Sequence, residues 1–417
     1  MLEPSSSATA LHAPLLAADV HQPFCRLPVI LTAITGGLVF AAIISVRSCL
    51  PTADIFTPLS DLLIFGANGA SWANGTVAIT TSGSISWACG LSDGALALLE
   101  EDTSALYHWH PQRQHRRKLF LPRLRAPVQC EQSGPWLYVA CFGIEEDPGR
   151  SGIAIIDLST WMVAHEQTFP GTTHVHHVYP TPGPPGGNTS KLFFMDVGDP
   201  WIQPSILGGV FEVLMEQDRA TYDPMMARRI GPRMHARAAI FPTAGAGEAP
   251  STAYVITQQP SGEATQVVSL VGDGWMSDSP TQVSAVARMA LPRPSWPSDG
   301  GADIFRLGAR LFATDRYGGN GALYELVGAD VEPDKMQVIG SVELGQHPRF
   351  TDALGSSDTI FSVSRLDGLL TVVDARRDQL QVIARLPAGV SLPSFLLRWG
   401  GGTTLKVSAF GFNESVK

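Results

Sequence analysis

The chain of 417 residues is 44% hydrophobic and only 16% charged, which supports a large buried core and excludes an intrinsically disordered protein. Its net charge of −9 disfavours nucleic acid as a partner. With 41 glycines and 31 prolines, the chain is rich in turn residues, as is typical of all-β proteins.

The N-terminal part contains a candidate membrane span. Residues 27–46 carry no charge, and twenty apolar residues are long enough to cross a bilayer as a helix. We expect an uncleaved signal anchor behind an unstructured tail at residues 1–26. A cleaved signal peptide is the alternative, although its apolar region is usually shorter and nearer the start. Arg26 and Arg47 flank the segment on opposite sides, so they barely decide its orientation.

Glycosylation motifs and cysteines bear on the location of the rest of the chain. Three Asn-x-Ser/Thr motifs, at Asn74, Asn188 and Asn413, follow the apolar segment and favour a luminal or extracellular main domain. The four cysteines beyond the segment are Cys49, Cys89, Cys130 and Cys141. Cys130 and Cys141 could pair across neighbouring strands, and four buried thiols are the alternative. We therefore predict a single-pass membrane protein with its main domain in the secretory route.

A repeated pattern begins after a linker at residues 47–58. Apolar runs that end in a polar residue start at positions 62, 136, 191, 252, 310 and 359, and each is followed by a turn and a second apolar run, starting at 74, 152, 208, 264, 320 and 367. A period of roughly 50 residues is typical of a propeller, in which each repeat is one antiparallel sheet. Residues 85–89 and 94–99 supply one more repeat within the longest interval.

The pattern therefore predicts an all-β fold, a seven-bladed β-propeller over residues 59–417, preceded by one transmembrane helix. Residues 392–400 and 404–410 are expected to return to the first blade and close the ring. Closure removes the exposed sheet edges that promote aggregation.

Three short motifs carry a resemblance to a known family. Residues 173–177 read THVHH and are followed by FFMDVGD at 193–199; GADIF at 301–305 is followed by LFATDR at 311–316; and HPRF stands at 347–350. In this order they resemble the seven-bladed lactonase family, which includes propeller-type 6-phosphogluconolactonase and carboxymuconate cyclase. The resemblance implies a hydrolase that opens an anionic sugar lactone, with a small molecule as its partner and no cofactor.

The resemblance also suggests site residues. The catalytic candidates are His176, Arg316 and Arg349, and the substrate-binding candidates are His174, Asp196, Gln258 and Asp303. Histidine suits proton transfer because its ordinary pKa lies near neutral pH, and arginine suits an anionic substrate because its planar fork matches carboxylate and phosphate. Other roles stay open: the histidines could form a surface cluster or bind a metal, Asp196 could cap a turn, and the arginines could bind backbone carbonyls.

Departures from the family pattern favour a second hypothesis. A glutamate of the family is replaced by Gln258, a histidine by Phe305, and an arginine by the pair Pro200-Trp201. Around Gly231–Arg237 the spacing slips, so the matching arginine cannot be identified. The alternative function is a catalytically inactive propeller that serves as a binding or scaffold module. A third hypothesis is a divalent-metal hydrolase that uses Asp196, Asp303 and the histidines.

Overall fold

The computed structural model describes residues 31–35, 38–42, 59, 61–113, 115–144, 147–181, 191–202, 204–214, 227–242, 251–259, 263–277, 279–294, 301–316, 320–327, 335–354, 358–376, 379–400 and 403–404. The chain divides into two compact units, Met1–Phe56 and Thr57–Lys417.

In the first unit, strands β1 (Leu31–Thr35) and β2 (Leu38–Ala42) pair antiparallel. They lie within the segment for which the sequence predicts a transmembrane helix. The other residues of 27–46, the tail at 1–26 and the linker at 47–58 lie outside the described residues. Within the described ranges, no helix combines the length and hydropathy that a bilayer crossing requires. The transmembrane helix is therefore not confirmed and stays a prediction.

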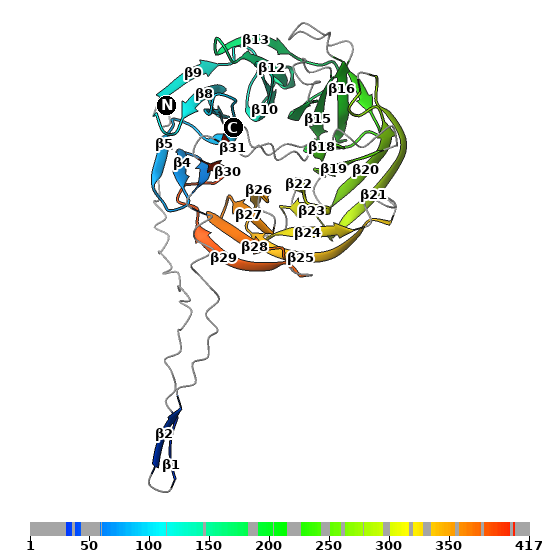
Figure 1. Ribbon diagram of the computed structural model, residues 1–417. Coiled ribbons are helices and arrows are strands. Elements are labelled where there is room, and N and C mark those ends of the chain that lie inside the picture. Colours follow the sequence, from blue (N-terminus) through cyan, green and yellow to red (C-terminus); the bar gives the residue numbers. More distant parts are fainter. Residues whose placement is uncertain are drawn as a thin grey trace, which may run out of the picture. The chain divides into compact units, whose positions relative to one another are not determined.

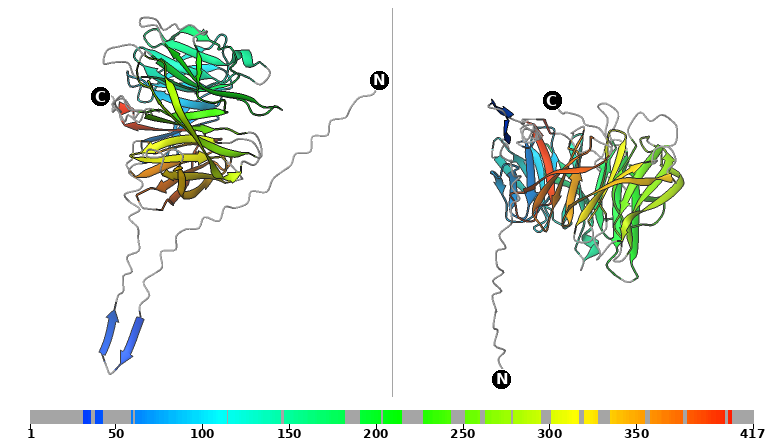
Figure 2. Two further views of the ribbon diagram at one scale, coloured as in Figure 1. Left: turned by 90° about the vertical axis from the view of Figure 1, so that its right-hand side faces the viewer. Right: turned by 90° about the horizontal axis from the view of Figure 1, so that it is seen from below.

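The second unit is a ring of seven antiparallel sheets (Figures 1 and 2). Six sheets are formed by four consecutive strands each, and the seventh combines both ends of the unit. The prediction of an all-β, seven-bladed propeller is confirmed.

The six consecutive sheets have the following strands: β6 (Ile85–Gly90), β7 (Leu96–Glu100), β8 (Ala105–His110) and β9 (His115–Phe120); β10 (Pro127–Ser133), β11 (Trp136–Cys141), β12 (Gly152–Asp157) and β13 (Met162–Gln167); β14 (Val175–Pro180), β15 (Lys191–Asp199), β16 (Ile206–Leu214) and β17 (Arg228–Ile230); β18 (Ala236–Ile240), β19 (Ser251–Thr257), β20 (Ala264–Asp273) and β21 (Gln282–Pro294); β22 (Gly301–Leu307), β23 (Arg310–Asp315), β24 (Gly321–Val327) and β25 (Gln337–Gly345); β26 (Pro348–Asp352), β27 (Thr359–Ser364), β28 (Leu369–Asp374) and β29 (Gln381–Pro387).

The seventh sheet closes the ring. Its order is β31-β30-β3-β4-β5, formed by β3 (Leu62–Gly66), β4 (Gly69–Trp72), β5 (Val77–Thr80), β30 (Phe395–Gly400) and β31 (Thr403–Thr404). Strand β30, from the C-terminal part, pairs with β3 from the N-terminal part of the unit. The predicted return of residues 392–400 to the first blade is thus confirmed. Because β30 covers the inner edge of β3, that edge is not left unpaired.

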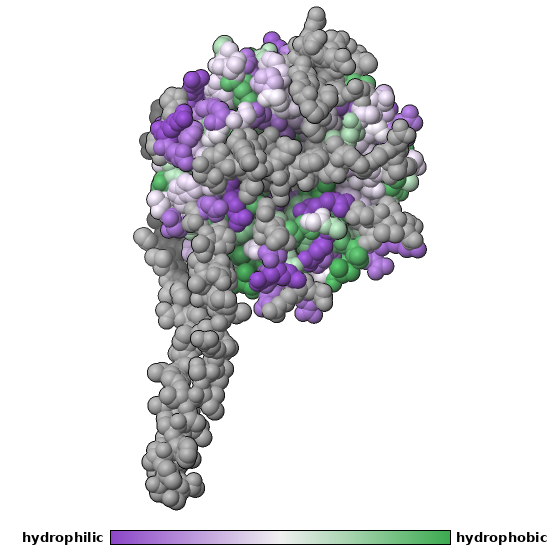
Figure 3. Space-filling view, in the orientation of Figure 1, coloured by the Kyte–Doolittle hydropathy of each residue, from purple (hydrophilic) through white to green (hydrophobic). Residues whose placement is uncertain are grey.

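Burial follows the position of a strand within its sheet. The second strands β7 and β11 are buried almost throughout, whereas the outermost strands β13 and β29 carry several exposed or half-buried positions. Both faces of a second strand are covered by neighbouring blades, so apolar residues fill it on both sides. The face shown in Figure 3 mixes hydrophilic with hydrophobic residues, as is usual for a folded domain.

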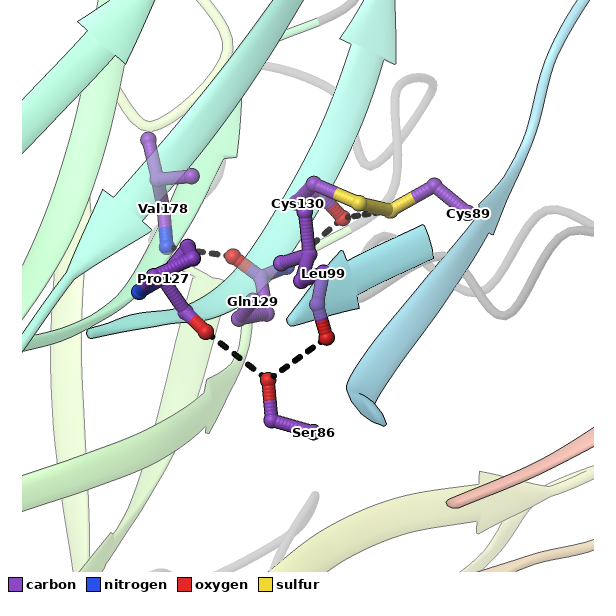
Figure 4. The surroundings of a disulfide bond; sticks show 7 residues. All are labelled: Ser86, Cys89, Leu99, Pro127, Gln129, Cys130 and Val178. Carbon is purple, nitrogen blue, oxygen red and sulfur yellow. Dashed lines mark hydrogen bonds between the residues drawn. A yellow bond between two sulfur atoms is a disulfide. The ribbon is translucent and has the colours of Figure 1, made fainter. Parts of the chain in front are cut away.

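The innermost strands β6, β10, β14, β18, β22, β26 and β30 contact one another in sequence around the axis. Several neighbouring inner strands are connected by a hydrogen bond between a side chain of one strand and the backbone of the next. Ser86 Oγ donates to Pro127 O (2.8 Å), and Val178 N donates to Gln129 Oε1 (2.9 Å). Ala239 N donates to Tyr179 OH (3.1 Å), and Thr351 N donates to Asp303 Oδ2 (2.9 Å). The first two appear in Figure 4. These bonds fix the inner strands in register, so their side chains have defined positions around the axis.

A disulfide joins the inner strands of two adjacent blades. It links Cys89 of β6 to Cys130 of β10, with their Cα atoms 6.1 Å apart (Figure 4). The suggested Cys130–Cys141 pair and the alternative of four thiols are both wrong. Cys130 lies opposite Val139 in the sheet, which leaves Cys141 diagonal to it, whereas Cys89 meets it from the next blade. Cys141 is a buried thiol, and Cys49 lies outside the described residues.

Of the glycosylation motifs, only the first lies in the described part of the chain. Asn74 is exposed in the turn between β4 and β5, where its side-chain oxygen accepts the Thr76 N–H (2.9 Å). Asn188 and Asn413 lie outside the described residues. Glycosylation stays a prediction.

Candidate functional site

Six of the seven inner strands share a β-bulge near their first residue. In each of them, at least one residue of the inner strand has no partner in the second strand of the sheet. In five strands a single residue is unpaired: Ser86, Val128, His176, Arg237 and Arg349. In β22, two residues, Ala302 and Asp303, lie opposite a single residue of β23. At a bulge, the side chain of the extra residue departs from the alternation of the two faces of the strand and points in a different direction. Because the blades repeat around one axis, residues at this shared position converge on the same face of the ring.

Electrostatic interactions indicate that four of these bulge residues lie near one another. Burial lowers the pKa of His176 well below its usual value, and the charges of Arg237 and Arg349 lower it further. Burial raises the pKa of Asp303 to about 7, while the same two arginines oppose the rise. We call His176, Arg237, Asp303 and Arg349 the axial cluster. It is drawn from four different blades.

His177 extends the cluster along β14. Its ring stacks on that of His176, with centroids 4.6 Å apart, and the two Nδ1 atoms lie 2.6 Å apart, so one ring donates a hydrogen bond to the other. Burial and the charge of Arg237 lower the pKa of His177 to about 3. Both histidines are therefore neutral near neutral pH.

An aromatic layer lies one residue further along the inner strands. The ring of Trp87 contacts His177 (centroids 5.6 Å apart), Phe350 (5.6 Å) and Phe395 (4.3 Å). These residues come from β6, β14, β26 and β30, so Trp87 contacts rings from three other blades near the axis. The layer gives the axial cluster an apolar floor, consistent with the burial that shifts its pKa values.

Asp303 has a second carboxyl nearby. Burial raises the pKa of Asp352 in β26 to about 6, although the hydrogen bond that its carboxylate accepts from Leu354 N (3.0 Å) lowers this pKa. The negative charge of Asp352 in turn raises the pKa of Asp303. Two carboxyls with pKa values near neutrality at one site are a usual feature of proton-transfer sites.

Two of the predicted binding residues organise the loop before β14. Asp196 Oδ1 accepts the N–H groups of Thr173 (3.2 Å), His174 (2.8 Å) and Gly198 (3.1 Å). His174 is buried, its Nδ1 lies 3.0 Å from Phe142 O, and its ring stacks on Phe142. Asp196 thus fits the turn-capping alternative, and both residues position the start of the strand that carries His176.

Gln258 contacts the axial cluster directly. Its Oε1 accepts a hydrogen bond from Arg237 Nη1 (2.7 Å), so an uncharged partner orients this guanidinium. The two arginines of 231–237 differ in burial. Arg233 is exposed, whereas Arg237 is buried at the bulge of β18.

Arg316 directly follows β23 and is buried, with 4% of its surface exposed. Within the described part of the chain, its Nε and Nη2 atoms have no hydrogen-bond partner. The first residue of β22 pairs with Asp315, and Arg316 is the next residue along the chain. In the preceding blade, the first residue of β18 pairs with Thr257, and Gln258 is the next residue. Arg316 and Gln258 therefore occupy the same position in the two blades. Register alone places Arg316 beside the axial cluster.

Phe305, which replaces a family histidine, lies away from the axis. It is buried among the residues between two blades and stacks on Phe312 with centroids 5.4 Å apart. Among the described residues, no group of three or more His, Cys, Asp or Glu side chains is placed to hold a metal ion. The metal-hydrolase hypothesis therefore finds no ligand set in that part of the chain.

Sequence reasoning missed Arg237, His177 and Asp352. Arg237 could have been found from its spacing: like His176 and Arg349, it stands just before the apolar residues of an inner strand. The slip at Gly231–Arg237 hid this. His177 belongs to the THVHH motif but was not given a role of its own, and Asp352 lies outside the quoted motifs; the electrostatic interactions around the axis single them out.

Comparisons with known proteins support the fold. No family model matches the chain, and no curated protein matches it. Among solved structures it resembles a periplasmic gluconolactonase from Pseudomonas aeruginosa, with 17% identity, a TM-score of 0.59, and 80% of this chain and 97% of that one covered. Provisionally named 6-phosphogluconolactonases from Bacteroides fragilis (14% identity, TM-score 0.58, 80% and 96% covered) and Bacteroides uniformis (16%, 0.57, 80% and 98%) are also similar. The suspected resemblance is confirmed as a shared propeller fold.

Proposed function

We propose that this protein is a lactonase-like hydrolase that opens an anionic sugar lactone. The observation that carries the proposal is the axial cluster, in which two arginines from different blades flank a histidine and a carboxyl with a pKa near 7. The gluconolactonase names of the structural neighbours support the same reaction class.

The two arginines supply the electrostatic part of the reaction. Guanidinium groups bind carboxylate or phosphate through paired N–H donors, and they stabilise the negative charge that develops on the carbonyl oxygen as water attacks. Gln258 orients Arg237 without neutralising it, because an amide carries no charge. A glutamate at this position would form an ion pair with Arg237 and reduce its attraction for an anionic substrate.

Proton transfer is assigned to Asp303 rather than to His176. Hydrolysis adds water across the ester bond: the attacking water loses a proton, and the ring oxygen gains one as the hydroxy acid forms. A carboxyl with a pKa of about 7 exchanges protons efficiently at neutral pH. Burial and the two arginines disfavour the protonated form of His176, so this ring instead accepts or donates a hydrogen bond in its neutral form.

The domain is proposed to lie in the lumen of the secretory route or outside the cell, behind a single membrane anchor. The Cys89–Cys130 disulfide supports an oxidising compartment. The exposed position of Asn74 leaves its glycosylation motif accessible.

The experiment that tests the function measures hydrolysis of 6-phosphoglucono-δ-lactone and glucono-δ-lactone by the purified full-length chain in a pH-stat, after subtraction of spontaneous opening. We expect faster opening of the phosphorylated lactone. Arg349→Ala should lower kcat/KM about 100-fold or more, since an interaction worth about 3 kcal/mol is lost. Arg316→Ala should lower it as well, because the register of Arg316 matches that of Gln258 in the preceding blade.

Arg376→Ala is the matched control, because Arg376 is 64% exposed, pairs with Asp374 and is not part of the axial cluster. It should retain full activity, and the melting curve of each variant shows whether it is folded. Opening at the spontaneous rate for both lactones would instead identify a binding or scaffold module. Activity abolished by a chelator would revive the metal hypothesis.

A further inference from the structure

One outer edge of the ring carries several cations. Strand β9 is the outermost strand of its sheet, and it includes Arg116, Arg117 and Lys118. Arg113 lies in the turn before this strand and Arg123 follows it, and all five residues are exposed. Strongly hydrophilic residues gather in Figure 3 at the part of the ring where Figure 1 labels β9. The whole chain has a net charge of −9, so this cationic edge differs in sign from the molecule that carries it.

Lys118 is neutralised by a buried carboxylate, whereas the arginines are not. Lys118 Nζ lies 3.1 Å from Oε2 of Glu100, whose side chain is fully buried. The ion pairs within the described part of the chain involve none of the four arginines. Their positive charges can therefore attract an external anion. We call these residues the basic row: Arg113, Arg116, Arg117 and Arg123.

The fold arranges the basic row along the strand. A strand rises about 3.3 Å per residue, so the six residues of β9 extend over about 17 Å. Arg116 and Arg117 are neighbours in a strand and point to opposite faces of the sheet. Arg116 Nη1 donates to Thr80 O of β5 in the adjacent blade (3.1 Å), and Arg117 lies opposite His108 of β8. A ligand that follows the outer edge of β9 therefore meets guanidinium groups from both faces.

We propose that the basic row binds a linear sulfated polysaccharide along the outer edge of β9. Guanidinium groups bind tetrahedral oxyanions through paired N–H donors, and sulfate presents such oxygens. Clusters of arginine and lysine are a usual feature of heparin-binding patches. The Cys89–Cys130 disulfide supports a compartment in which such polysaccharides occur. The surface is separate from the axial cluster, and the inference does not depend on lactone hydrolysis.

Other polyanions fit the basic row less well. A bilayer surface is bound by cations together with apolar side chains that enter the headgroup layer. Among the described residues of β9, Phe120 is the one large apolar residue that is exposed, and Lys118 Nζ lies over its ring, 4.7 Å from the centroid. An acidic peptide would bind this edge as an added strand, and cationic side chains on an edge strand oppose such pairing. The net charge and the disulfide both disfavour nucleic acid.

Calorimetry with a heparin oligosaccharide and the full-length chain tests the inference. We expect binding that weakens as NaCl is added, because the arginines displace counterions from the polyanion. The double variant Arg116→Ala/Arg117→Ala should bind about tenfold more weakly or worse at low salt. Its slope of log affinity against log salt concentration should be smaller by roughly one to two. Arg117→Lys keeps the charge and should retain most of the affinity.

Arg288→Ala/Arg385→Ala is the matched control. Both arginines are exposed on the outermost strands of other blades, β21 and β29. Arg385 Nη2 donates to Glu343 O (3.1 Å), much as Arg116 donates to Thr80 O, so each double variant loses two charges and one such bond. The control should bind heparin as the wild type does. Melting curves show that each variant is folded.

Three results would overturn the inference. The first is no binding of heparin by the wild type at low salt, and the second is an equal loss of affinity in the two double variants. The third is binding of polyglutamate, or of vesicles that contain phosphatidylserine, as tight as that of heparin, since the partner would then be an acidic protein or a membrane. Lactone hydrolysis should be the same in both double variants, so none of these results bears on the proposed function.

Discussion

Burial in the folded protein shifts the pKa of Asp303 toward neutral pH. Its pKa of about 7 in the folded protein exceeds the ordinary value of 3.8, so folding favours the protonated form. The resulting stability is fully present below pH 3.8 and is lost as the pH rises through 7. Asp303→Asn cannot ionise but still accepts the Thr351 N–H. From pH 4 to pH 8 the variant should therefore gain stability relative to the wild type, by up to about 4 kcal/mol.

Urea unfolding at the two pH values measures this difference. Asp273→Asn serves as the control, because Asp273 is exposed and its replacement should change little. Wild type and Asp303→Asn curves that shift in parallel with pH would show that Asp303 titrates as an ordinary surface carboxyl. The assignment of proton transfer to this residue would then fail.

Single residues show how far the sequence could predict the site. His176, Asp303 and Arg349 were expected from motifs, and in the structure Arg349 interacts electrostatically with both of the others, while their roles stay predictions. Arg237 was not identified, because the slip in spacing at Gly231–Arg237 hid its position just before the apolar residues of β18. The pKa of His176 was expected near neutrality from its residue type. Burial and two arginines lower it, and neither is visible in the sequence.

Among the strands, the disulfide between β6 and β10 gives the sharpest prediction. Its two cysteines are 41 residues apart in sequence, so the cross-link should stabilise the fold by about 4 kcal/mol if it acts by restricting the unfolded chain. Cys89→Ser should lose this amount in urea unfolding. Cys141→Ser, which removes only a buried thiol, should keep the cross-link.

Peptide mapping with thiols blocked checks the pairing directly and also tests the proposed compartment. A peptide that joins Cys89 to Cys130, recovered from the protein as cells make it, is the expected result. Recovery of all cysteines as free thiols would place the domain in a reducing compartment and contradict the proposed location.

The strands were predictable to different degrees. The apolar runs from 136 onward correspond to the second and third strands of their sheets, such as β11 with β12 and β19 with β20. In the first repeat, the run at 74 leads instead into the outermost strand β5, because the short β4 lies between. Apart from β6 and β30, the inner strands escaped the pattern because several carry polar residues at the axis, and the outer strands escaped it because many of their positions face solvent.

The closed ring is what allows distant parts of the chain to form one site. Strand β30 completes the sheet of β3, so the inner strands form an unbroken circle. The sequence period predicted this arrangement, since a repeated unit with uniform geometry must return on itself or leave an edge exposed. The sequence period does not predict which side chains lie at the axis, because that depends on the position of the bulge in each blade.

The central claim, that arginines of different blades hold one anionic ligand, is tested most directly by the affinity for 6-phosphogluconate, the open product. Calorimetry with the full-length chain should show one equivalent bound. Arg237→Ala and Arg349→Ala should each weaken binding at least tenfold, while Arg376→Ala leaves it unchanged. Equal affinities for the wild type and both axial variants, or no binding by the wild type, would contradict the account.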